Sequence, residues 1–314
     1  MEISTSNSNP YLSILIPVYK SALFVNKTVS KINSELDQLH YSYEIILVND
    51  GSPDNSWDVI KSIAQNNPKV KSYNLLKNYG QHSAVLCAIQ KATGTYLITM
   101  DDDLQNPPSE IHKLVSKIEE GYDLVFGQFE KKKHAGYRKL GTVLINFLNK
   151  QIFNKPPGIT LSNFRIFNRN VAKRVLAYKT NHPYIPGLLL LNANSIANTM
   201  TKHDSRTDGV SNYSILKILK LMSRLLINYS SYPLKVLTSI GLLIALMSFG
   251  FGAFVFIKAA FLSESSPGWA SLMIMLSFLN GITILMTGIL GIYVSRTLNQ
   301  LSSVQPFIIS DHEE

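Results

Sequence analysis

Three consecutive carboxylates, Asp101, Asp102 and Asp103, directly follow an apolar run in the segment YLITMDDDLQNPP. Adjacent like charges raise one another's pKa, so this triplet needs a cation. Because side chains alternate along a strand, we expect Asp101 and Asp103 on one side and Asp102 on the other. Two carboxylates form an incomplete shell for Mg²⁺, which adds water and phosphate oxygens. The triplet therefore indicates a metal–diphosphate site, whereas an acidic helix cap would explain only one Asp.

The segments around the triplet alternate between strand and helix patterns. Short apolar runs that end in turn residues, as buried parallel strands do, lie at residues 11–19, 43–51, 70–76, 95–101 and 122–127. Amphipathic segments follow at residues 55–66, 81–92 and 108–120. This alternation predicts a parallel α/β sheet, in which ligands bind beyond the C-terminal ends of the strands. One crevice there would collect the strand-end residues around Pro17, Asp50 and Asn78 together with the Asp triplet.

The composition restricts the partners and the compartment. Lys and Arg outnumber Asp and Glu 30 to 21, a formal net charge of +9 that suits nucleic acid, an anionic membrane surface or a phosphorylated substrate. Cys87 is the single cysteine, so no internal disulfide forms and a reducing compartment is the simplest reading. The polar start MEISTSNSNPY has no apolar core, so we expect no signal peptide.

Two uncharged apolar runs, residues 236–257 and 269–294, predict a transmembrane hairpin. At ~1.5 Å per residue the shorter run spans roughly 33 Å, enough to cross a hydrocarbon core of ~30 Å. Two buried helices of a soluble core are the alternative, which the length without charge disfavours. Basic residues flank the hairpin at Lys217, Lys220, Arg224, Lys235 and Arg296. By the positive-inside rule, both termini and the large polar region should be cytoplasmic.

Taken together, these segments resemble the family 2 glycosyltransferases of GT-A fold. More narrowly, they resemble the polyprenyl-phosphate glycosyltransferases, which include dolichyl-phosphate mannose synthases and bactoprenol glucosyltransferases. The matching pieces are, in order, ILIPVY, ILVNDGSPDNSW, KNYGQHSAVLCAI, ATGTYLITMDDDLQNPP, YDLVFG, NFRIFNR, YIPG and SRTDGVSNYS. The paired C-terminal apolar runs match as well, so the resemblance covers nearly all of the chain.

The resemblance implies a role for each matching residue. The nucleotide site would be lined by Pro17, Tyr19, Asp50, Ser52, Asn78, Gln81, Asp101 and Asp102. In that set Pro17, Tyr19 and Asp50 would hold the base and ribose, while Asp102 would stay outside the metal shell. Mg²⁺ or Mn²⁺ would be bound by Asp103, Asp101 and Gln105, and catalysis would use Asp101, Asp103 and Arg165. The acceptor phosphate would be held by Arg206, Arg138, Lys139, Ser211 and Tyr213.

The chain departs from the family pattern at three places. Lys20-Ser21 replaces the usual Asn-Glu, and the basic loop FEKKKHAGYRK is richer in lysine, which binds phosphate without the bidentate fork of arginine. Asn163 stands where the family usually has an Asp. A lipid phosphate acceptor, with a second pKa near ~6, is already mostly dianionic and needs no general base. Loss of the acid is therefore tolerable for this acceptor, and it can instead signal altered sugar recognition.

The predicted domain organisation is a cytoplasmic GT-A catalytic domain at residues 1–212, which is Rossmann-like and contains an amphipathic helix at about 136–153. A juxtamembrane amphipathic helix at 213–232, the two membrane helices within 233–298 and a cytoplasmic tail at 299–314 follow. Amphipathic helices with basic flanks lie in the headgroup plane of membranes. For the first of these helices, packing against the catalytic domain or another subunit is an equal alternative.

These features predict an integral protein of the bacterial inner membrane. It would move a sugar from a nucleotide-diphosphate sugar, with UDP favoured over GDP, to polyprenyl (undecaprenyl) phosphate at the cytoplasmic leaflet. The reaction would be a metal-dependent single displacement with inversion. We expect a homo-oligomer and no nucleic-acid partner. The alternatives are a transferase that extends a lipid-linked oligosaccharide, and a catalytically silent nucleotide-sugar-binding membrane protein.

Overall fold

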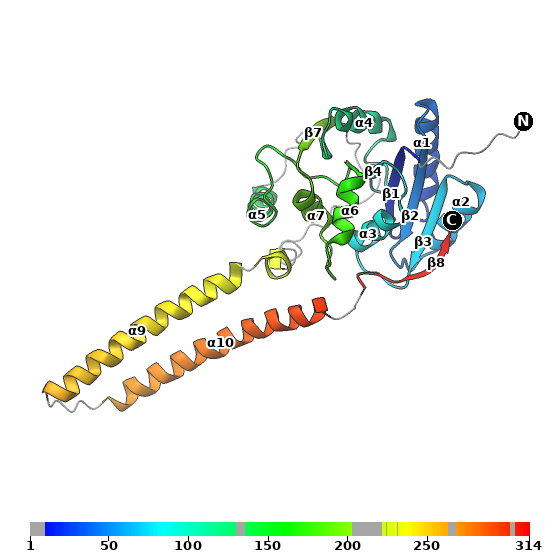
Figure 1. Cartoon of the computed structure of the whole chain (residues 1–314). Coiled ribbons are helices and arrows are strands. Elements are labelled where there is room, and N and C mark those ends of the chain that lie inside the picture. The colour runs from blue at the N-terminus through cyan, green and yellow to red at the C-terminus, as the bar shows by residue number, and fades with distance from the viewer. Residues whose placement is uncertain are drawn as a thin grey trace, which may run out of the picture. The chain divides into compact units, whose positions relative to one another are not determined.

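The computed structural model describes residues 10–129, 136–202, 222–223, 225–230, 232–262, 268–301 and 305–314. The chain divides into two compact units. The first comprises Met1–Tyr213 together with Val304–Glu314 and contains a β-sheet with helices packed on it. The second, Ser214–Ser303, contains two long helices that run side by side in opposite directions (Figure 1).

Four parallel strands form the centre of the sheet in the first unit. They are β1 (Leu12–Val18), β2 (Tyr43–Asn49), β3 (Val70–Leu75) and β4 (Tyr96–Thr99), and they pair in the order β4-β1-β2-β3. Every residue of β1 and β2 is buried, as expected of parallel strands that are covered on both faces. Because β2 and β4 lie on opposite sides of β1, the chain reverses its direction of travel there, and this switch point favours a ligand crevice.

The complete sheet is mixed: the five predicted strands run in one direction, and three strands that the sequence did not predict complete it. Strand β6 (Arg165–Asn168) lies antiparallel between β4 and β5 (Leu124–Phe129), and β7 (Ile196–Thr201) pairs parallel with β5. Strand β8 (Ile309–Glu313) pairs antiparallel with β3. The order is β7-β5-β6-β4-β1-β2-β3-β8. The three strands that the sequence did not predict are short, and β7 and β8 are rich in polar residues and contain no apolar run.

Helices cover the two faces of this sheet. Their bounds are α1 Val25–Gln38, α2 Ser56–Asn66, α3 Gln81–Lys91, η1 Pro108–Glu110, α4 Ile111–Glu119, α5 Gly136–Phe153, α6 Arg169–Ala177 and α7 Ile185–Asn192. Apolar residues of α1, α2 and α4 pack with β1 and β2 in one hydrophobic core. Helix α3 packs against β1 and β2 and also contacts α6 and α7 (Figure 1). The three amphipathic segments predicted between the strands thus correspond to α2, α3 and η1 with α4.

Helix α5 has the bounds predicted for the first interfacial helix. Its C-terminal part packs on the first unit: Phe153 is fully buried, and its ring lies where a Cβ on Gly187 of α7 would sit. Leu148 is buried as well, whereas Phe147 is exposed. Packing against the catalytic domain therefore accounts for this end of the helix. The second predicted interfacial helix, residues 213–232, lies mostly outside the described residues.

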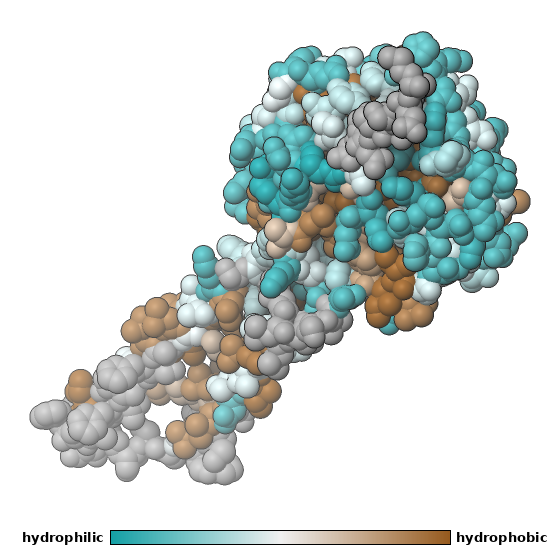
Figure 2. All heavy atoms as spheres, turned by 45° about the vertical axis from the view of Figure 1, so that its right-hand side comes forward, coloured by the Kyte–Doolittle hydropathy of each residue, from teal (hydrophilic) through white to brown (hydrophobic). Residues whose placement is uncertain are grey.

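The second unit consists of α9 (Tyr232–Leu262) and α10 (Trp269–Leu301). Large apolar side chains of both helices are exposed, including Leu246 and Ile284, and hydrophobic residues gather on the visible side of the helices (Figure 2). Among the described residues one stretch, Phe278–Ser295 in α10, is long and apolar enough to cross a membrane, with a mean hydropathy of 1.7. A transmembrane pair therefore stays a prediction.

The predicted tail at residues 299–314 contains folded structure, because β8 completes the edge of the sheet beside β3. The chain thus leaves the first unit after β7, forms α9 and α10, and returns to the same sheet.

A buried carboxylate, Glu44 of β2, links the central strands. It accepts hydrogen bonds from Ser13 Oγ (2.6 Å), from the backbone N of Thr93 (2.6 Å) and from Lys71 Nζ (2.9 Å). The Thr93 hydroxyl donates to it as well, at 2.9 Å. Burial by itself would raise the pKa of Glu44, but these hydrogen bonds outweigh burial and the pKa is lowered. Glu44 therefore joins β1, β3 and the turn before β4 as an ionised group.

We predict that Glu44→Gln lowers the free energy of unfolding by about 1–3 kcal/mol at pH 7, because the amide loses the ion pair with Lys71 and mismatches the donors. A folded-state pKa below the unfolded value of ~4.3 stabilises the fold fully above that value, and the stabilisation is lost as the pH falls through the folded-state pKa. The difference between Glu44→Gln and wild type should therefore shrink below about pH 4.

Urea unfolding followed by Trp57 fluorescence at pH 7, 5, 4 and 3 measures this difference. Asp58→Asn, at an exposed position of α2, is the control and should show no comparable loss. A difference that stays constant down to pH 3 would contradict the role assigned to Glu44.

Candidate functional site

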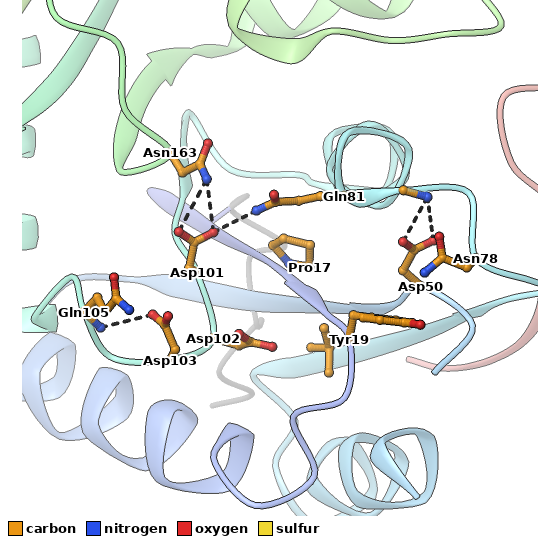
Figure 3. Close-up of a pocket in the computed structure, with 12 residues that line it drawn as sticks. Pro17, Tyr19, Asp50, Asn78, Gln81, Asp101, Asp102, Asp103, Gln105 and Asn163 are labelled. Carbon is orange, nitrogen blue, oxygen red and sulfur yellow. Dashed lines mark hydrogen bonds between the residues drawn. The ribbon is translucent and has the colours of Figure 1, made fainter. Parts of the chain in front are cut away.

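A pocket of about 440 Å³ lies at the C-terminal ends of β1, β2 and β4 (Figure 3). Pockets of roughly 300–1,000 Å³ hold small-molecule ligands and cofactors. Its lining residues are Pro17, Val18, Tyr19, Asp50, Asn78, Gly80, Gln81, Asp101, Asp102, Asp103, Gln105 and Asn163. The residues predicted for the nucleotide and the metal all line this pocket except Ser52. Val18 was expected at this crevice as a strand-end residue, and Asn163 was noted at the position of the family's usual Asp, whereas Gly80 was not indicated by the sequence.

All three residues of the Asp triplet line the pocket, which corrects the predicted alternation. Strand β4 ends at Thr99, and Asp102 and Asp103 lie in a turn after it, so the two-sided geometry of a strand does not apply. The Ser21 hydroxyl, which donates to the carbonyl of Tyr19 at 3.3 Å, acts to lower the pKa of Asp102. The backbone carbonyl of Asp102 accepts a hydrogen bond from Thr28 Oγ1 at 2.7 Å. Two elements on the β1 side, the β1–α1 loop and α1, thus fix the turn.

Neutral amides hold the carboxylate of Asp101. Gln81 Nε2 donates to its Oδ1 at 2.8 Å, and Asn163 Nδ2 lies 3.4 Å from both of its oxygens (Figure 3). Burial and the charge of Asp103 nevertheless raise the pKa of Asp101. Burial likewise raises the pKa of Asp102 to about 6. Negative charge is therefore destabilised in this pocket, and a bound cation would relieve it.

The donor set fits a hard divalent cation that shares its shell with a phosphate group. In the part of the chain that the structure describes, no three His, Cys, Asp or Glu side chains are grouped as metal ligands. Mg²⁺ commonly uses only one or two carboxylates and completes its octahedron with water and substrate oxygens. Asp103 and Gln105 offer oxygens at the pocket wall, and the backbone N of Gln105 donates to Asp103 Oδ1 at 3.2 Å.

Asp50 fixes the opposite wall of the pocket. Its Oδ1 accepts from the backbone N of Tyr79 at 2.7 Å. Its Oδ2 accepts from the backbone N of Gly80 at 2.9 Å (Figure 3). The side chain is almost fully buried, and burial raises its pKa although these amides act to lower it. Both oxygens predicted to bind the base therefore already hold the loop between β3 and α3.

Ser52 supports the pocket from behind. Its hydroxyl donates to Asn49 Oδ1 at 2.5 Å and accepts from the backbone N of Lys20 at 3.1 Å. Lys20 has a positive φ of 56° and directly follows Tyr19, which lines the pocket. Ser52 therefore fixes the backbone beside Tyr19 rather than facing the cavity.

Arg165 is buried behind the pocket, with 1% of its surface exposed. Its Nε donates to Thr99 Oγ1 at 3.0 Å and its Nη1 to the carbonyl of Ser162 at 3.3 Å. Burial lowers its pKa to about 10, while the charge of Asp101 acts in the opposite direction. A guanidinium in this position holds β4 to β6 and sets the electrostatic environment of Asp101. These contacts are with the protein itself, and the catalytic role predicted for Arg165 stays a prediction.

His82, which sequence reasoning did not assign, lies in the same layer as Arg165. Both residues line a small cavity beneath the main pocket, together with Asp101 and Asn163. Burial lowers the pKa of His82 to about 4, and the charge of Arg165 acts in the same direction. The imidazole is thus neutral at pH 7 and packs edge-on against Tyr184 of the YIPG segment. Its position directly after Gln81 is the sequence signal that could have indicated it.

The residues predicted to hold the acceptor phosphate are not part of the described pocket. Arg206, Ser211 and Tyr213 lie outside the described residues. Arg138 and Lys139 belong to the first turn of α5. The structure thus brings together the donor and metal residues, and the acceptor residues stay a prediction.

Comparison with known proteins identifies the family to which the donor and metal residues belong. Residues 13–176, just over half of the chain, match the model of Glycosyl transferase family 2. The uncharacterized glycosyltransferase sll0501 of Synechocystis sp. is 29% identical over 302 residues, which cover 96% of this chain and 95% of that protein. The uncharacterized glycosyltransferase YkcC of Bacillus subtilis is 27% identical over 298 residues, covering 95% and 92%.

Solved structures are similar at lower identity. Glucosyl-3-phosphoglycerate synthase from Mycobacterium tuberculosis, in complex with Mn²⁺, UDP-glucose and phosphoglyceric acid, has a TM-score of 0.49 and 18% identity. The match covers 70% of this chain and 78% of that one.

We predict that Gly51→Ala loosens the wall held by Asp50. Gly51 has a φ of 59°, and a Cβ there would lie 2.4 Å from the backbone carbon of Lys77 and 2.6 Å from the backbone N of Asn78. The loop must shift, so exchange of the Tyr79 and Gly80 amide hydrogens should become about tenfold faster, the equivalent of ~1.4 kcal/mol.

Hydrogen exchange with mass spectrometry, resolved to the peptide that contains these amides, measures the change. Gly158→Ala is a matched control, because Gly158 also has a positive φ (82°) but has no neighbouring atom within 4 Å of an added Cβ. It should strain its own loop and leave the peptide at 77–81 unchanged. Equal protection of that peptide in Gly51→Ala and wild type would contradict the prediction.

Proposed function

The chain belongs to glycosyl transferase family 2, and from that premise we propose that it transfers a sugar from a UDP-sugar to polyprenyl phosphate at a membrane. Its GT-A catalytic unit uses a nucleotide sugar as donor, as the family requires. To this donor our proposal adds a polyprenyl phosphate acceptor, a membrane location and a bound metal. The observation that carries this proposal is the exposed apolar surface of α9 and α10. In the order of the chain, these two long helices lie between β7 and β8, which both belong to the catalytic sheet.

The connectivity of the sheet supports two membrane crossings rather than one. Strand β7 precedes α9 and α10 in the chain, strand β8 follows them, and both strands belong to the same sheet. A single crossing by α10 would leave β8 on the opposite side of the membrane from β3, with which it pairs. If Phe278–Ser295 crosses, α9 must therefore cross as well. The donor pocket and both ends of the hairpin then share the cytoplasm with nucleotide sugars.

The pocket supports a division of roles among its walls. Pro17, Tyr19 and the loop fixed by Asp50 would enclose the base and ribose, at the C-terminal ends of β1 and β2. Asp103 and Gln105 would hold Mg²⁺ or Mn²⁺ beside the diphosphate. When bound, the metal would neutralise charge that develops on the departing diphosphate.

A phosphate acceptor fits the side chains around Asp101. The phosphate oxygen forms a bond to the anomeric carbon while the bond to the nucleoside diphosphate breaks and takes its electron pair, so the anomeric configuration inverts. The nucleophile is a dianion with a second pKa near ~6, and no proton has to be removed at pH 7. Asn163 provides an amide, not a base, and it binds Asp101. The protein therefore acts by positioning and by charge stabilisation.

Other acceptors are favoured less by these contacts. A sugar hydroxyl of a lipid-linked oligosaccharide needs a general base, and Asp101 is already engaged by Gln81 and Asn163. A silent sugar-binding protein would have no need for three carboxylates at a diphosphate site. For the acceptor phosphate we propose Arg206, Ser211 and Tyr213, with Arg138 and Lys139 of α5.

We predict that membranes containing the full chain, given undecaprenyl phosphate and a panel of radiolabelled UDP- and GDP-sugars, produce a labelled lipid that extracts into butanol. One UDP-sugar should give most of the label. Wild type without added lipid phosphate is the control for acceptor dependence. Label that appears only after a lipid-linked oligosaccharide is added would identify the alternative transferase, and label that never enters the organic phase would overturn the lipid acceptor.

We predict that Asp103→Asn lowers turnover by at least ~100-fold, since it removes a charge from the oxygen donors at the diphosphate. Asp102→Asn is the matched control, with the same change of charge one residue away, and should keep turnover within about tenfold of wild type because Asp102 interacts with Ser21. Initial rates with Mg²⁺ or Mn²⁺, and with excess chelator, measure both effects. Full turnover in excess chelator would contradict a metal at this site.

A further inference from the structure

The C-terminal strand β8 forms the edge of the catalytic sheet beside β3. Tyr73 pairs with His312 and Asn74 with Asp311, and the register shifts before Leu75 pairs with Ile309. Past the strand, the backbone N of Leu76 donates to the carbonyl of Ile308 at 2.9 Å. The pairing therefore continues to the last residue of β3 and into the loop toward the donor pocket.

Side chains fasten β8 to three elements of the first unit. Tyr73, which is 1% exposed, donates from its hydroxyl to Glu314 at 2.6 Å, and its ring stacks on that of His312. Lys61 of α2 forms an ion pair with Asp311 at 2.8 Å. Lys91 of α3 lies 3.4 Å from Glu314. These contacts define one register of β8 against β3.

Two routes lead from β8 to the walls of the pocket. The first runs through the backbone: Leu76, held by Ile308, precedes Asn78, and the next two amides are those that bind Asp50. Gly51 fits closely against the same loop. A displacement of the end of β3 would therefore move the donors that satisfy the Asp50 carboxylate.

The second route is a chain of hydrogen bonds. Ser310 Oγ donates to the carbonyl of Asn74 at 3.1 Å, and Asn74 Oδ1 accepts from Asn49 Nδ2 at 2.7 Å. Asn49 Oδ1 accepts from Ser52 Oγ at 2.5 Å, and Ser52 accepts from the backbone N of Lys20. This chain ends beside Tyr19, on the wall proposed for the base.

We propose that β8 is a positioning element of the nucleotide-sugar pocket, through which the chain that returns from α10 holds the base-binding walls in place. Without β8, β3 would be an edge strand with unpaired N–H and C=O groups, and its end would fray. The proposal rests on the nucleotide-sugar donor of the proposed function and is independent of the acceptor. On this proposal, the strand that follows the apolar helices supports the donor pocket and is not merely a C-terminal tail.

The test uses the full chain with residues 309–313 replaced by Gly-Ser-Gly-Ser-Gly, which keeps the length and removes the strand side chains. We expect the Kd for UDP in the presence of Mn²⁺ and the KM for the nucleotide sugar to rise on the order of tenfold, whereas the KM for the acceptor stays within about twofold. UDP binding needs no acceptor, so this readout stays valid if the lipid acceptor proves wrong.

A milder pair of variants tests the role of β8 if the chain with residues 309–313 replaced does not fold. Tyr73→Phe and Glu314→Gln each alter the same half-buried hydrogen bond and should raise the donor KM about two- to fivefold. Their effects should be less than additive when combined, because they share one contact. Lys117→Ala, which removes an ion pair of similar length on α4, is the control and should leave the donor KM unchanged.

A donor KM and a UDP Kd that stay within twofold of wild type in all of these variants would overturn the proposal. An equal loss for donor and acceptor would overturn it too, because a general loss of stability would then explain the data.

Discussion

Two carboxylates held by neutral donors, one buried and one half-buried, are the interaction on which the rest of the site depends. The backbone amides of Tyr79 and Gly80 bind Asp50, and the side-chain amides of Gln81 and Asn163 bind Asp101. Neutral donors satisfy the hydrogen-bonding capacity of a carboxylate without cancelling its charge. The pocket therefore keeps a negative potential that suits a cation, and the cation in turn suits a diphosphate. The same bonds fix two walls of the pocket before any ligand arrives, which lowers the entropy lost on binding.

The sequence predicted those parts of the fold that local patterns determine. β1 to β5 and the helices α2, α3 and α4 follow from apolar runs and turn residues, whereas α1 was not among the predicted segments. The strand ends bring the Asp triplet and Asp50 to one pocket. The alternating pattern of a strand could not predict the side-chain directions of the Asp triplet, because β4 ends at Thr99 and the triplet lies after it. β6, β7 and β8 have partners that are distant in sequence, and no local signal specifies such pairing. Arg165 was assigned to catalysis, but its burial could not be predicted because it depends on the pairing of β4 with β6.

Asn163 shows how an amide, in place of a carboxylate, changes the charge around Asp101. Its amide donates to Asp101, a contact that an aspartate there could make only as a protonated acid. Two carboxylates at this separation would share a proton and raise one another's pKa. The amide avoids that repulsion and leaves Asp101 with a defined set of partners. The pocket thereby has one base fewer and a lower density of charge, a combination suited to an acceptor that is itself an anion.

The pairing of β8 with β3 also imposes an order on biosynthesis. Tyr73 and Glu314, which share a hydrogen bond, are 241 residues apart in the chain. Proteins fold from the N-terminus during synthesis, and β3 emerges from the ribosome long before its outer neighbour. The edge of the sheet must wait until α9 and α10 have been translated, and only then can the last strand close it. Each molecule therefore completes its catalytic sheet only after its apolar helices have been made.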